Sequence, residues 1–190
     1  MSLLLSASFS RWRADSRSEL APGGTAPHPD YNDNTFDNDI AILELQDNLE
    51  FGPNVAAVEL PSSGLDTLAT GAKCAVTGWG FATQGGGHLT ADLRLVYLDI
   101  VDHETCLKAY DSYHLEVNDM SVCAGVPGAS GAKGPCNGDI GGPLVDQSSK
   151  KQVGIVSWGE GCGKHGYPSL YTSTAAYADW IQETLLLGII

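Results

Sequence analysis

Residues 136–144 read Cys-Asn-Gly-Asp-Ile-Gly-Gly-Pro-Leu, and this stretch decides the fold. Three of its nine residues are glycine, which lacks a Cβ and lets backbone N–H groups turn toward one side of a loop. The stretch carries a single carboxylate, Asp139, and ends before a run of residues that is typical of a strand.

The same stretch resembles the trypsin/chymotrypsin family of serine endopeptidases, where it is written C-x-G-D-S-G-G-P-L and the serine is the nucleophile. Ile140 stands at the serine position in this chain. The resemblance implies that the backbone N–H groups of Gly138 and Ile140 form the oxyanion hole, in a loop that also holds Asp139. Isoleucine offers no nucleophilic atom, and losing the nucleophile lowers turnover by roughly 10⁶ in related chemistry. The resemblance therefore implies a catalytically inert position at Ile140.

A second motif leads to the triad aspartate of the same family. Residues 28–32, HPDYN, and residues 35–45, TFDNDIAILEL, resemble the family's segments around that aspartate. By this resemblance Asp39 is the residue that orients the catalytic histidine and stabilises its charged form. The residues alone leave another interpretation open, in which Asp39 caps the backbone of its own loop.

The catalytic histidine itself has no matching segment. The family's T-A-A-H-C pattern is absent from the sequence, and its five histidines fit solvated loops: His28, His88, His103, His114 and His165. The family's I-V-G-G start is absent too, so no new N-terminal ammonium is expected to pair with Asp139. An unpaired buried carboxylate is costly, and we therefore expect the loop around Asp139 to be mobile or zymogen-like.

The remaining matches imply an all-β fold, a trypsin-like double β-barrel with an incomplete first barrel and a C-terminal α-helix. Residues 71–80 resemble the C-x-V-x-G-W-G segment that opens the second barrel. Apolar patterns and family matches together predict strands at 40–45, 55–60, 93–100, 120–125 and 153–158. We expect a short helix at 106–113 and a terminal helix capped by Thr174. We divide the chain into an unassigned, disordered leader (1–25), the remnant of the first barrel (26–66), the second barrel (67–173) and the terminal helix (174–190).

Composition and charge narrow the classes of function. The chain has 190 residues, 43% of them hydrophobic, and a formal net charge of −13. Nucleic acids and anionic membranes are bound through basic patches, so this charge argues against both as partners. The sequence has no window of about eighteen uncharged apolar residues, so none of it is expected to span a membrane. The resemblance implies a secreted, extracellular protein, although the short apolar run at residues 3–5 makes a poor secretory signal.

Five cysteines, an odd number, point to an oxidising compartment with one thiol left over. The family partner of Cys74 falls at Asp146, so Cys74 is expected to be a free thiol. A zinc site is the alternative for these thiols, but no pair has the C-x2–4-C spacing of such sites, and we expect no metal and no other cofactor. Family positions imply two disulfides, each worth about 3 kcal/mol in the chain-entropy model: Cys106–Cys123 and Cys136–Cys162.

The family's specificity pocket maps onto Gly134 at its base and Ser169 as its second residue. Trypsins carry an aspartate at the first position, whereas neither residue here is charged. The resemblance therefore implies a preference for apolar or aromatic side chains, as in chymotrypsin. Residues 131–136 also look weakly similar to crustacean collagenolytic proteases, from which Ser169 departs. The strand that ends in Ser157, Trp158 and Gly159 would pair with the backbone of a bound peptide.

These matches imply a serine endopeptidase homologue that is inactive as written. We expect it to bind proteins or peptides, such as substrate-like segments and protease inhibitors, through the groove at Trp158. Two alternatives stay open. The chain is an incomplete copy of an active, secreted endopeptidase with chymotrypsin-like or collagenolytic specificity, or it is a structural fragment without activity.

Overall fold

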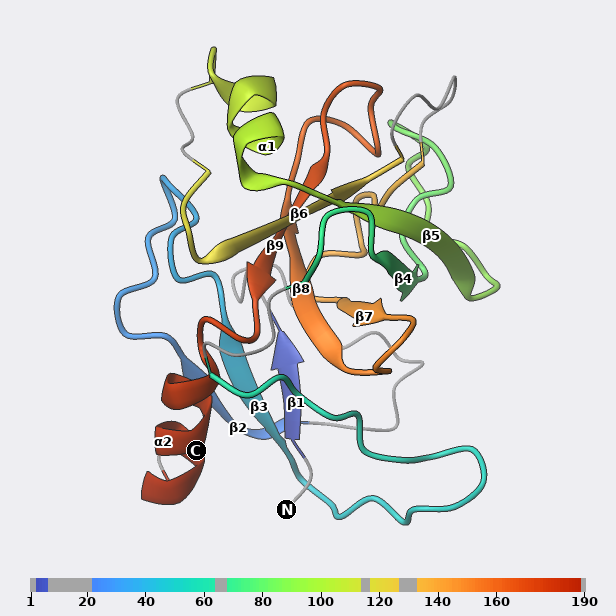
Figure 1. Ribbon diagram of the computed structural model, residues 1–190. Coiled ribbons are helices and arrows are strands. Elements are labelled where there is room, and N and C mark those ends of the chain that lie inside the picture. The colour runs from blue at the N-terminus through green and yellow to red at the C-terminus, as the bar shows by residue number, and fades with distance from the viewer. Residues whose placement is uncertain (1–2, 7–21, 64–67, 114–116, 127–132, 189–190) are drawn as a thin grey trace.

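The computed structural model describes residues 3–6, 22–63, 68–113, 117–126 and 133–188. Within these ranges the chain is mostly β, with two helices, which confirms the expected fold class (Figure 1). The strands are β1 (Leu3–Ser6), β2 (Pro22–Pro27), β3 (Ala41–Leu45), β4 (Lys73–Gly78), β5 (Arg94–Val101), β6 (Ser121–Gly125), β7 (Pro143–Asp146), β8 (Gln152–Trp158) and β9 (Ser169–Ser173). The helices are α1 (His103–Tyr110) and α2 (Ala178–Leu187).

Six strands close into an antiparallel barrel in the order β4-β5-β6-β9-β8-β7, and β7 pairs back to β4. Large apolar side chains fill its interior, among them Val76, Leu98, Leu144 and Tyr171. β8 buries six of its seven residues because it is covered on both faces. Val156 belongs to the barrel core, whereas its neighbour Ile155 belongs to a second core outside the barrel. The barrel is therefore the rigid body against which the rest of the chain packs.

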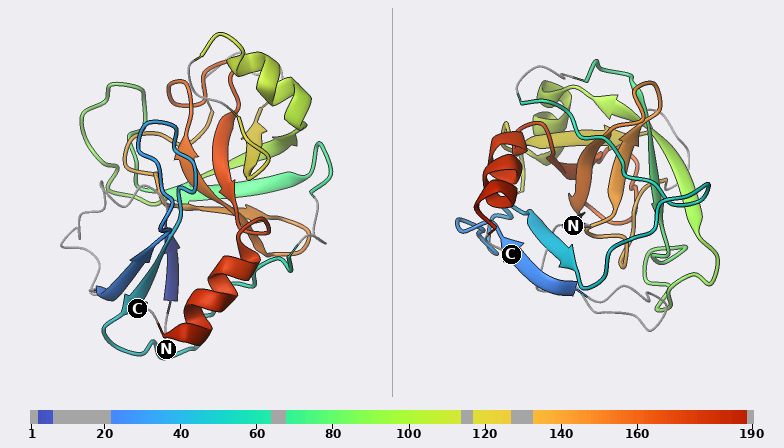
Figure 2. Two further views of the ribbon diagram at one scale, coloured as in Figure 1. Left: turned by 90° about the vertical axis from the view of Figure 1, so that its left-hand side faces the viewer. Right: turned by 90° about the horizontal axis from the view of Figure 1, so that it is seen from below.

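A three-stranded antiparallel sheet with the order β1-β3-β2 lies beside the barrel (Figures 1 and 2). Its central strand, β3, buries Ala41, Ile42 and Leu43. Ile42 meets Ile155 of β8 and Ile181 of α2 in the second core, and α2 lies alongside the sheet in the views of Figure 2. The C-terminal helix thus packs against both the small sheet and β8 of the barrel.

Two expectations for the N-terminal third differ from the structure. β1 and β2 take the place of part of the disordered leader expected at 1–25, because β3 offers both of its edges for pairing. Residues 1–2 and 7–21 of that leader lie outside the described residues. The strand expected at 55–60 is wrong: Val55 makes an isolated bridge to Gly52, and Val58 is 47% exposed. An apolar pattern forms a strand only where a neighbouring strand accepts its hydrogen bonds.

Helix α1 begins at His103, three residues before the start expected at Cys106. Asp102 caps it, because its Oδ1 accepts a hydrogen bond from Thr105 N at 2.8 Å. A side-chain acceptor at this position satisfies one of the unpaired N–H groups of the first turn. The helix therefore starts where its cap stands rather than where its apolar residues begin.

Helix α2 begins at Ala178, and Thr174 does not cap it. The Thr174 hydroxyl instead donates to the carbonyl of Gln152 at 2.7 Å. The apolar face of the helix packs as expected, with Tyr177, Trp180, Ile181 and Leu185 in the second core. Neither helix of the described ranges combines the length and the apolar character that a bilayer-spanning segment needs.

Candidate functional site

The loop at the nucleophile position consists of two consecutive turns. Asp139 N donates to the carbonyl of Cys136, and Gly142 N donates to the carbonyl of Asp139, both at 2.9 Å. Gly138 and Gly141 occupy the third position of these turns, with φ of 97° and 87°. A type II turn requires a positive φ at this position, which only glycine adopts at no steric cost. The Asn-Gly and Ile-Gly pairs of the sequence therefore set the shape of the loop.

Two backbone N–H groups hold the carboxylate of Asp139. Gly80 N donates to Oδ1 at 2.7 Å, and Cys136 N donates to Oδ2 at 2.9 Å. A Cβ placed on Gly80 would come within 2.3 Å of Asp139 Oδ2, so a larger residue at position 80 would displace this carboxylate. The expectation that this carboxylate lacks a partner is wrong, because two backbone N–H groups donate to it. Hydrogen bonds to an ionised acceptor are among the strong ones in proteins.

Ile140 is the second residue of the second turn, and its side chain is half-buried against the barrel core. Its neighbours are tied to β8. Gly141 N donates to the carbonyl of Val156, and Val156 N donates to the carbonyl of Gly142, both at 2.9 Å. Ile140, for which the family resemblance implies the nucleophile position, is therefore a packed hydrocarbon group on a loop that is hydrogen-bonded to the barrel.

Asp39, the expected triad remnant, is 1% exposed and lies just before β3. The Ser157 hydroxyl donates to Asp39 Oδ2 at 2.5 Å, and the Thr172 hydroxyl donates to its backbone carbonyl at 2.7 Å. Ser157 follows Val156, which carries the hydrogen bonds to the loop of Ile140. The structure thus attaches Asp39 and the nucleophile loop to neighbouring residues of one strand.

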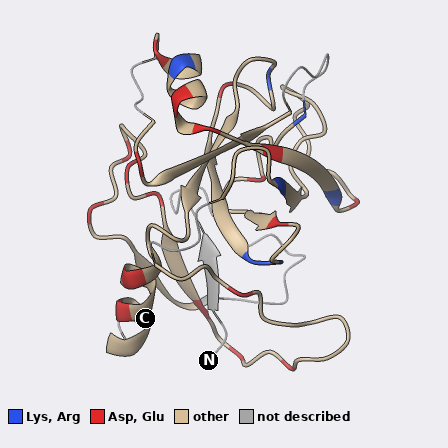
Figure 3. Cartoon of the chain, in the orientation of Figure 1, with Lys and Arg blue, Asp and Glu red and all other residues tan. Residues whose placement is uncertain are grey.

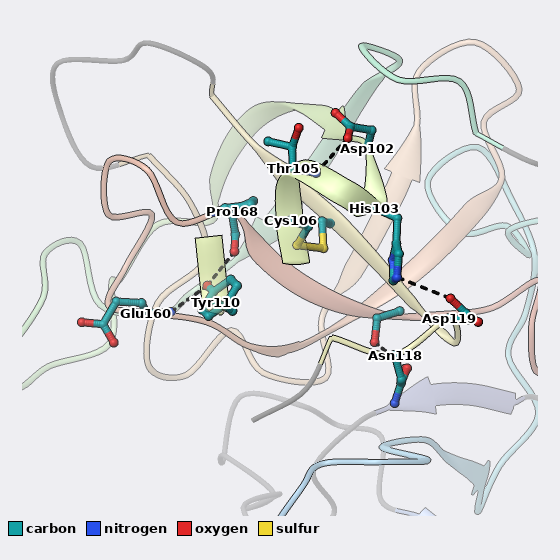
Figure 4. The surroundings of a disulfide bond; sticks show 11 residues. Asp102, His103, Thr105, Cys106, Tyr110, Asn118, Asp119, Glu160 and Pro168 are labelled. Atoms are coloured by element: carbon teal, nitrogen blue, oxygen red, sulfur yellow. Dashed lines mark hydrogen bonds and ion pairs between the residues drawn. A yellow bond between two sulfur atoms is a disulfide. The ribbon is translucent and has the colours of Figure 1, made fainter. Parts of the chain in front are cut away.

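The described histidines lie in several different environments. The ring of His28 packs 5.5 Å from that of Tyr177 and 5.0 Å from that of Trp180, so His28 is half-buried rather than solvated. Its Nδ1 accepts a hydrogen bond from Asp30 N at 3.2 Å, and burial lowers its pKa. His103 Nε2 lies 3.4 Å from Asp119 Oδ1 at the exposed start of α1 (Figure 4). His88 and His165 are exposed, and His114 lies outside the described residues.

The residues expected to form the specificity pocket lie together. A Cβ placed on Gly134 would be 3.3 Å from Ser169 Oγ, and one placed on Gly159 would be 3.3 Å from Ser169 Cα. Ser169 is buried at the start of β9. Gly134, Gly159 and Ser169 carry no charge themselves, whereas the cavity that Ser169 lines is also lined by Lys133 and Lys164.

Aromatic rings that sequence reasoning missed surround Trp158. The ring of Phe36 stacks on it at 6.4 Å, and the ring of Tyr110 meets it edge-on at 5.0 Å. The Tyr110 hydroxyl donates to the carbonyl of Pro168 at 2.7 Å and accepts from Glu160 N at 3.1 Å (Figure 4). Burial raises the pKa of Tyr110 to about 12. Tyr110 therefore connects α1 to Glu160 and Pro168, the two ends of the segment that precedes Ser169.

The structure contains the two disulfides that the family positions imply. Cys106–Cys123 joins α1 to β6, at the centre of Figure 4. Cys136–Cys162 joins the loop of Ile140 to the segment after Trp158. Both bonds therefore hold elements that line the candidate site.

Cys74 is a buried free thiol, opposite Asp146 in the β4–β7 pairing. Burial raises the pKa of Cys74 to about 12, and the carboxylates of Asp146 and Asp99 add to the effect. A protonated, buried thiol is a poor nucleophile and a poor metal ligand. In the described ranges no three His, Cys, Asp or Glu side chains gather in a set that could hold a metal ion.

A family model described as Trypsin matches residues 6–181 of the sequence. The chain belongs to the trypsin family. The match begins well before residue 26, so it takes in most of the segment that we expected to be an unassigned leader. The trypsin-family assignment also places peptide hydrolysis among the activities of the relatives.

Several trypsin-family proteases are similar to this chain. Trypsin-1 of Astacus astacus is 42% identical over 158 residues, and the vitellin-degrading protease of Bombyx mori is 39% identical over 163 residues. These matches cover 82% and 86% of this chain, but 63% and 59% of the two relatives. A solved structure of neuropsin, a serine protease expressed in the limbic system of mouse brain, matches with a TM-score of 0.76 and 30% identity. That match covers 87% of this chain and 71% of neuropsin. The chain thus spans about three fifths of the length of the curated relatives.

Proposed function

We propose that this trypsin-family chain is a protein-binding homologue that does not hydrolyse peptides. The observation that carries the proposal is Ile140, a hydrocarbon side chain at the nucleophile position that packs against the barrel core. Acyl transfer by the chemistry of this family needs a hydroxyl group and a base that takes its proton. A site that keeps the loop and the pocket but offers no hydroxyl at this position is best suited to binding.

The ligand that we infer is an extended peptide segment with an apolar or aromatic side chain, such as the exposed loop of a protease inhibitor. The lack of charge on Gly134 and Ser169 themselves supports this inference, and so do the aromatic rings around Trp158. Aromatic residues are frequent anchors of protein interfaces because they bury a large area with few rotatable bonds. Asp and Glu lie on both helices and on several loops (Figure 3), so a strongly acidic partner is disfavoured.

We further infer a secreted protein that works outside the cell. The two disulfides support this inference, since such bonds persist in oxidising compartments.

Calorimetric titration with a protein inhibitor that presents an aromatic contact residue tests the proposal. We expect saturable binding, an inhibitor that stays intact by mass spectrometry, and affinity about tenfold weaker or worse in Trp158→Ala. The matched control is Tyr97→Ala, an aromatic residue on the outer face of β5 that is 56% exposed. Cleavage of the inhibitor would contradict the proposal, and a cooperatively folded chain without binding would contradict it equally. Broad, non-cooperative melting would favour a structural fragment.

A second candidate function rests on length. The chain spans 59% and 63% of two relatives that it matches, which supports an incomplete copy of an active endopeptidase. Sequencing the transcript upstream of the codon for Met1 distinguishes the binding homologue from the incomplete copy of an active enzyme. A reading frame that continues into a T-A-A-H-C-like segment and carries a serine codon at position 140 would favour the active enzyme.

A further inference from the structure

We propose that Ile140 is a hydrophobic latch that holds the loop of residues 136–142 onto the barrel. This loop, called the latch loop below, is the loop of two turns described above. Its Asp139 carboxylate is fixed by Gly80 and Cys136, and its backbone is fixed by Val156. The inference concerns the conformation of the chain itself and does not depend on the proposed binding function.

Polar contacts hold the latch loop on both sides of Ile140, and the Cys136–Cys162 disulfide ties its first residue. Gly80, just after β4, donates a hydrogen bond to the Asp139 carboxylate. Val156 of β8 forms backbone hydrogen bonds with Gly141 and Gly142. Ile140 is the residue between these two sets of hydrogen bonds. Its side chain is half-buried against the barrel core, to which Val76, Leu144 and Val156 belong.

An apolar side chain at this point stabilises the observed conformation because its removal from water is favourable. A hydroxyl group in the same place would lose that contribution and would need a hydrogen-bond partner of its own. Ile140, which offers no nucleophilic group, therefore also stabilises the conformation of the latch loop. The latch loop needs no ammonium group to order it, since Asp139 already has its donors and Ile140 supplies the packing.

Amide hydrogen exchange by NMR tests the latch on the intact chain. The reporters are the N–H groups of Gly141, Gly142 and Val156, whose hydrogen bonds hold the latch loop. In Ile140→Ser we expect these amides to exchange about tenfold faster or more, through local opening, while the amides that pair β5 with β6 keep their rates. The matched control is Val58→Ser, which removes a β-branched side chain from an exposed site and should leave the reporters unchanged.

Unchanged exchange of the reporter amides in Ile140→Ser would overturn the proposal. Uniform acceleration over all strands would overturn it as well, because Ile140 would then contribute only to global stability. Should Ile140→Ser fail to fold, Ile140→Val carries the test, since it removes one methyl group and keeps the shape. In Ile140→Val, amide exchange that is accelerated less than in Ile140→Ser, and only in the latch loop, supports the latch. Unchanged exchange, or exchange accelerated equally over all strands, overturns it.

Discussion

The Ser157 hydroxyl donates a hydrogen bond to the Asp39 carboxylate at 2.5 Å, across the boundary between the closed barrel and the small sheet. Asp39 is almost fully buried, and a buried carboxylate is tolerated only where donors satisfy it. Ser157 belongs to β8, the strand that also holds the latch loop through Val156. The hydrogen bond between Ser157 and Asp39 therefore contributes to the stability of the fold.

Replacing Ser157 by alanine should lower the free energy of unfolding by about 1–3 kcal/mol, because a buried charged acceptor loses one of its donors. Urea denaturation followed by fluorescence measures the change. Ser63→Ala, at an exposed site, is the control and should stay within about 0.5 kcal/mol of the parent chain. Equal stability of the two variants would show that the hydrogen bond to Asp39 carries no net stabilisation.

Asp146 should make the protein sensitive to acid. Burial alone would raise the pKa of this carboxyl, but hydrogen bonds from Ser149 and Ser148 more than offset it and hold the pKa at about 2. Because the folded-state pKa lies below the unfolded value near 4, the stabilisation is present above about pH 4 and is lost as the pH falls toward 2. We expect the difference in unfolding free energy between the parent chain and Asp146→Asn to shrink by about 1–2 kcal/mol over that window. A difference that does not vary between pH 5 and pH 2 would contradict this.

His28 should contribute a second pH dependence, near neutrality. Burial lowers its pKa, and the nearby Asp30 carboxylate only partly offsets this effect. The unfolded chain then binds the proton more readily than the folded chain, so stability is present above the unfolded pKa of about 6.5 and is lost as the pH falls below it. NMR titration of the His28 ring should give a pKa below the ordinary histidine value of about 6.5, and His28→Gln should flatten the slope of stability against pH. A His28 pKa at or above that ordinary value would refute the assignment.

The Cys74 thiol should not react in the folded protein. It is buried, and its pKa of about 12 keeps it protonated at any ordinary pH. Iodoacetamide at pH 8 should leave the native chain unmodified and should add one group per chain in guanidinium chloride, with the two disulfides intact. Rapid modification of the native chain would show that β4 and β7 separate readily at Cys74.

The barrel could be expected from the sequence because the glycine-rich loop at Ile140 and the segment at Cys74 resemble motifs of the trypsin family. The donors to Asp139 could not be predicted, since Gly80 is 59 residues away and gives only a backbone N–H, which nearly every residue carries. The start of α1 did have a signal, because Asp102 followed by Glu104 is typical of a helix N-terminus.

The strand expected at 55–60 has a local apolar pattern but no partner strand in the described ranges. Its apolar residues have the right pattern, but pairing depends on a neighbour that the local sequence does not specify. The aromatic group at Trp158 had no signal of any kind. Phe36 and Tyr110 come from the segment before β3 and from α1, and no spacing in the sequence marks them as neighbours of Trp158.

The central claim is that no nucleophile acts in the site of this chain. Intact-mass spectrometry after incubation with an excess of a fluorophosphonate probe tests it most directly, with active bovine trypsin as the positive control. We expect no adduct on the folded chain and no turnover of an aromatic peptide substrate, because Ile140 offers no oxygen. Stoichiometric labelling at one serine or threonine, together with turnover, would contradict the account.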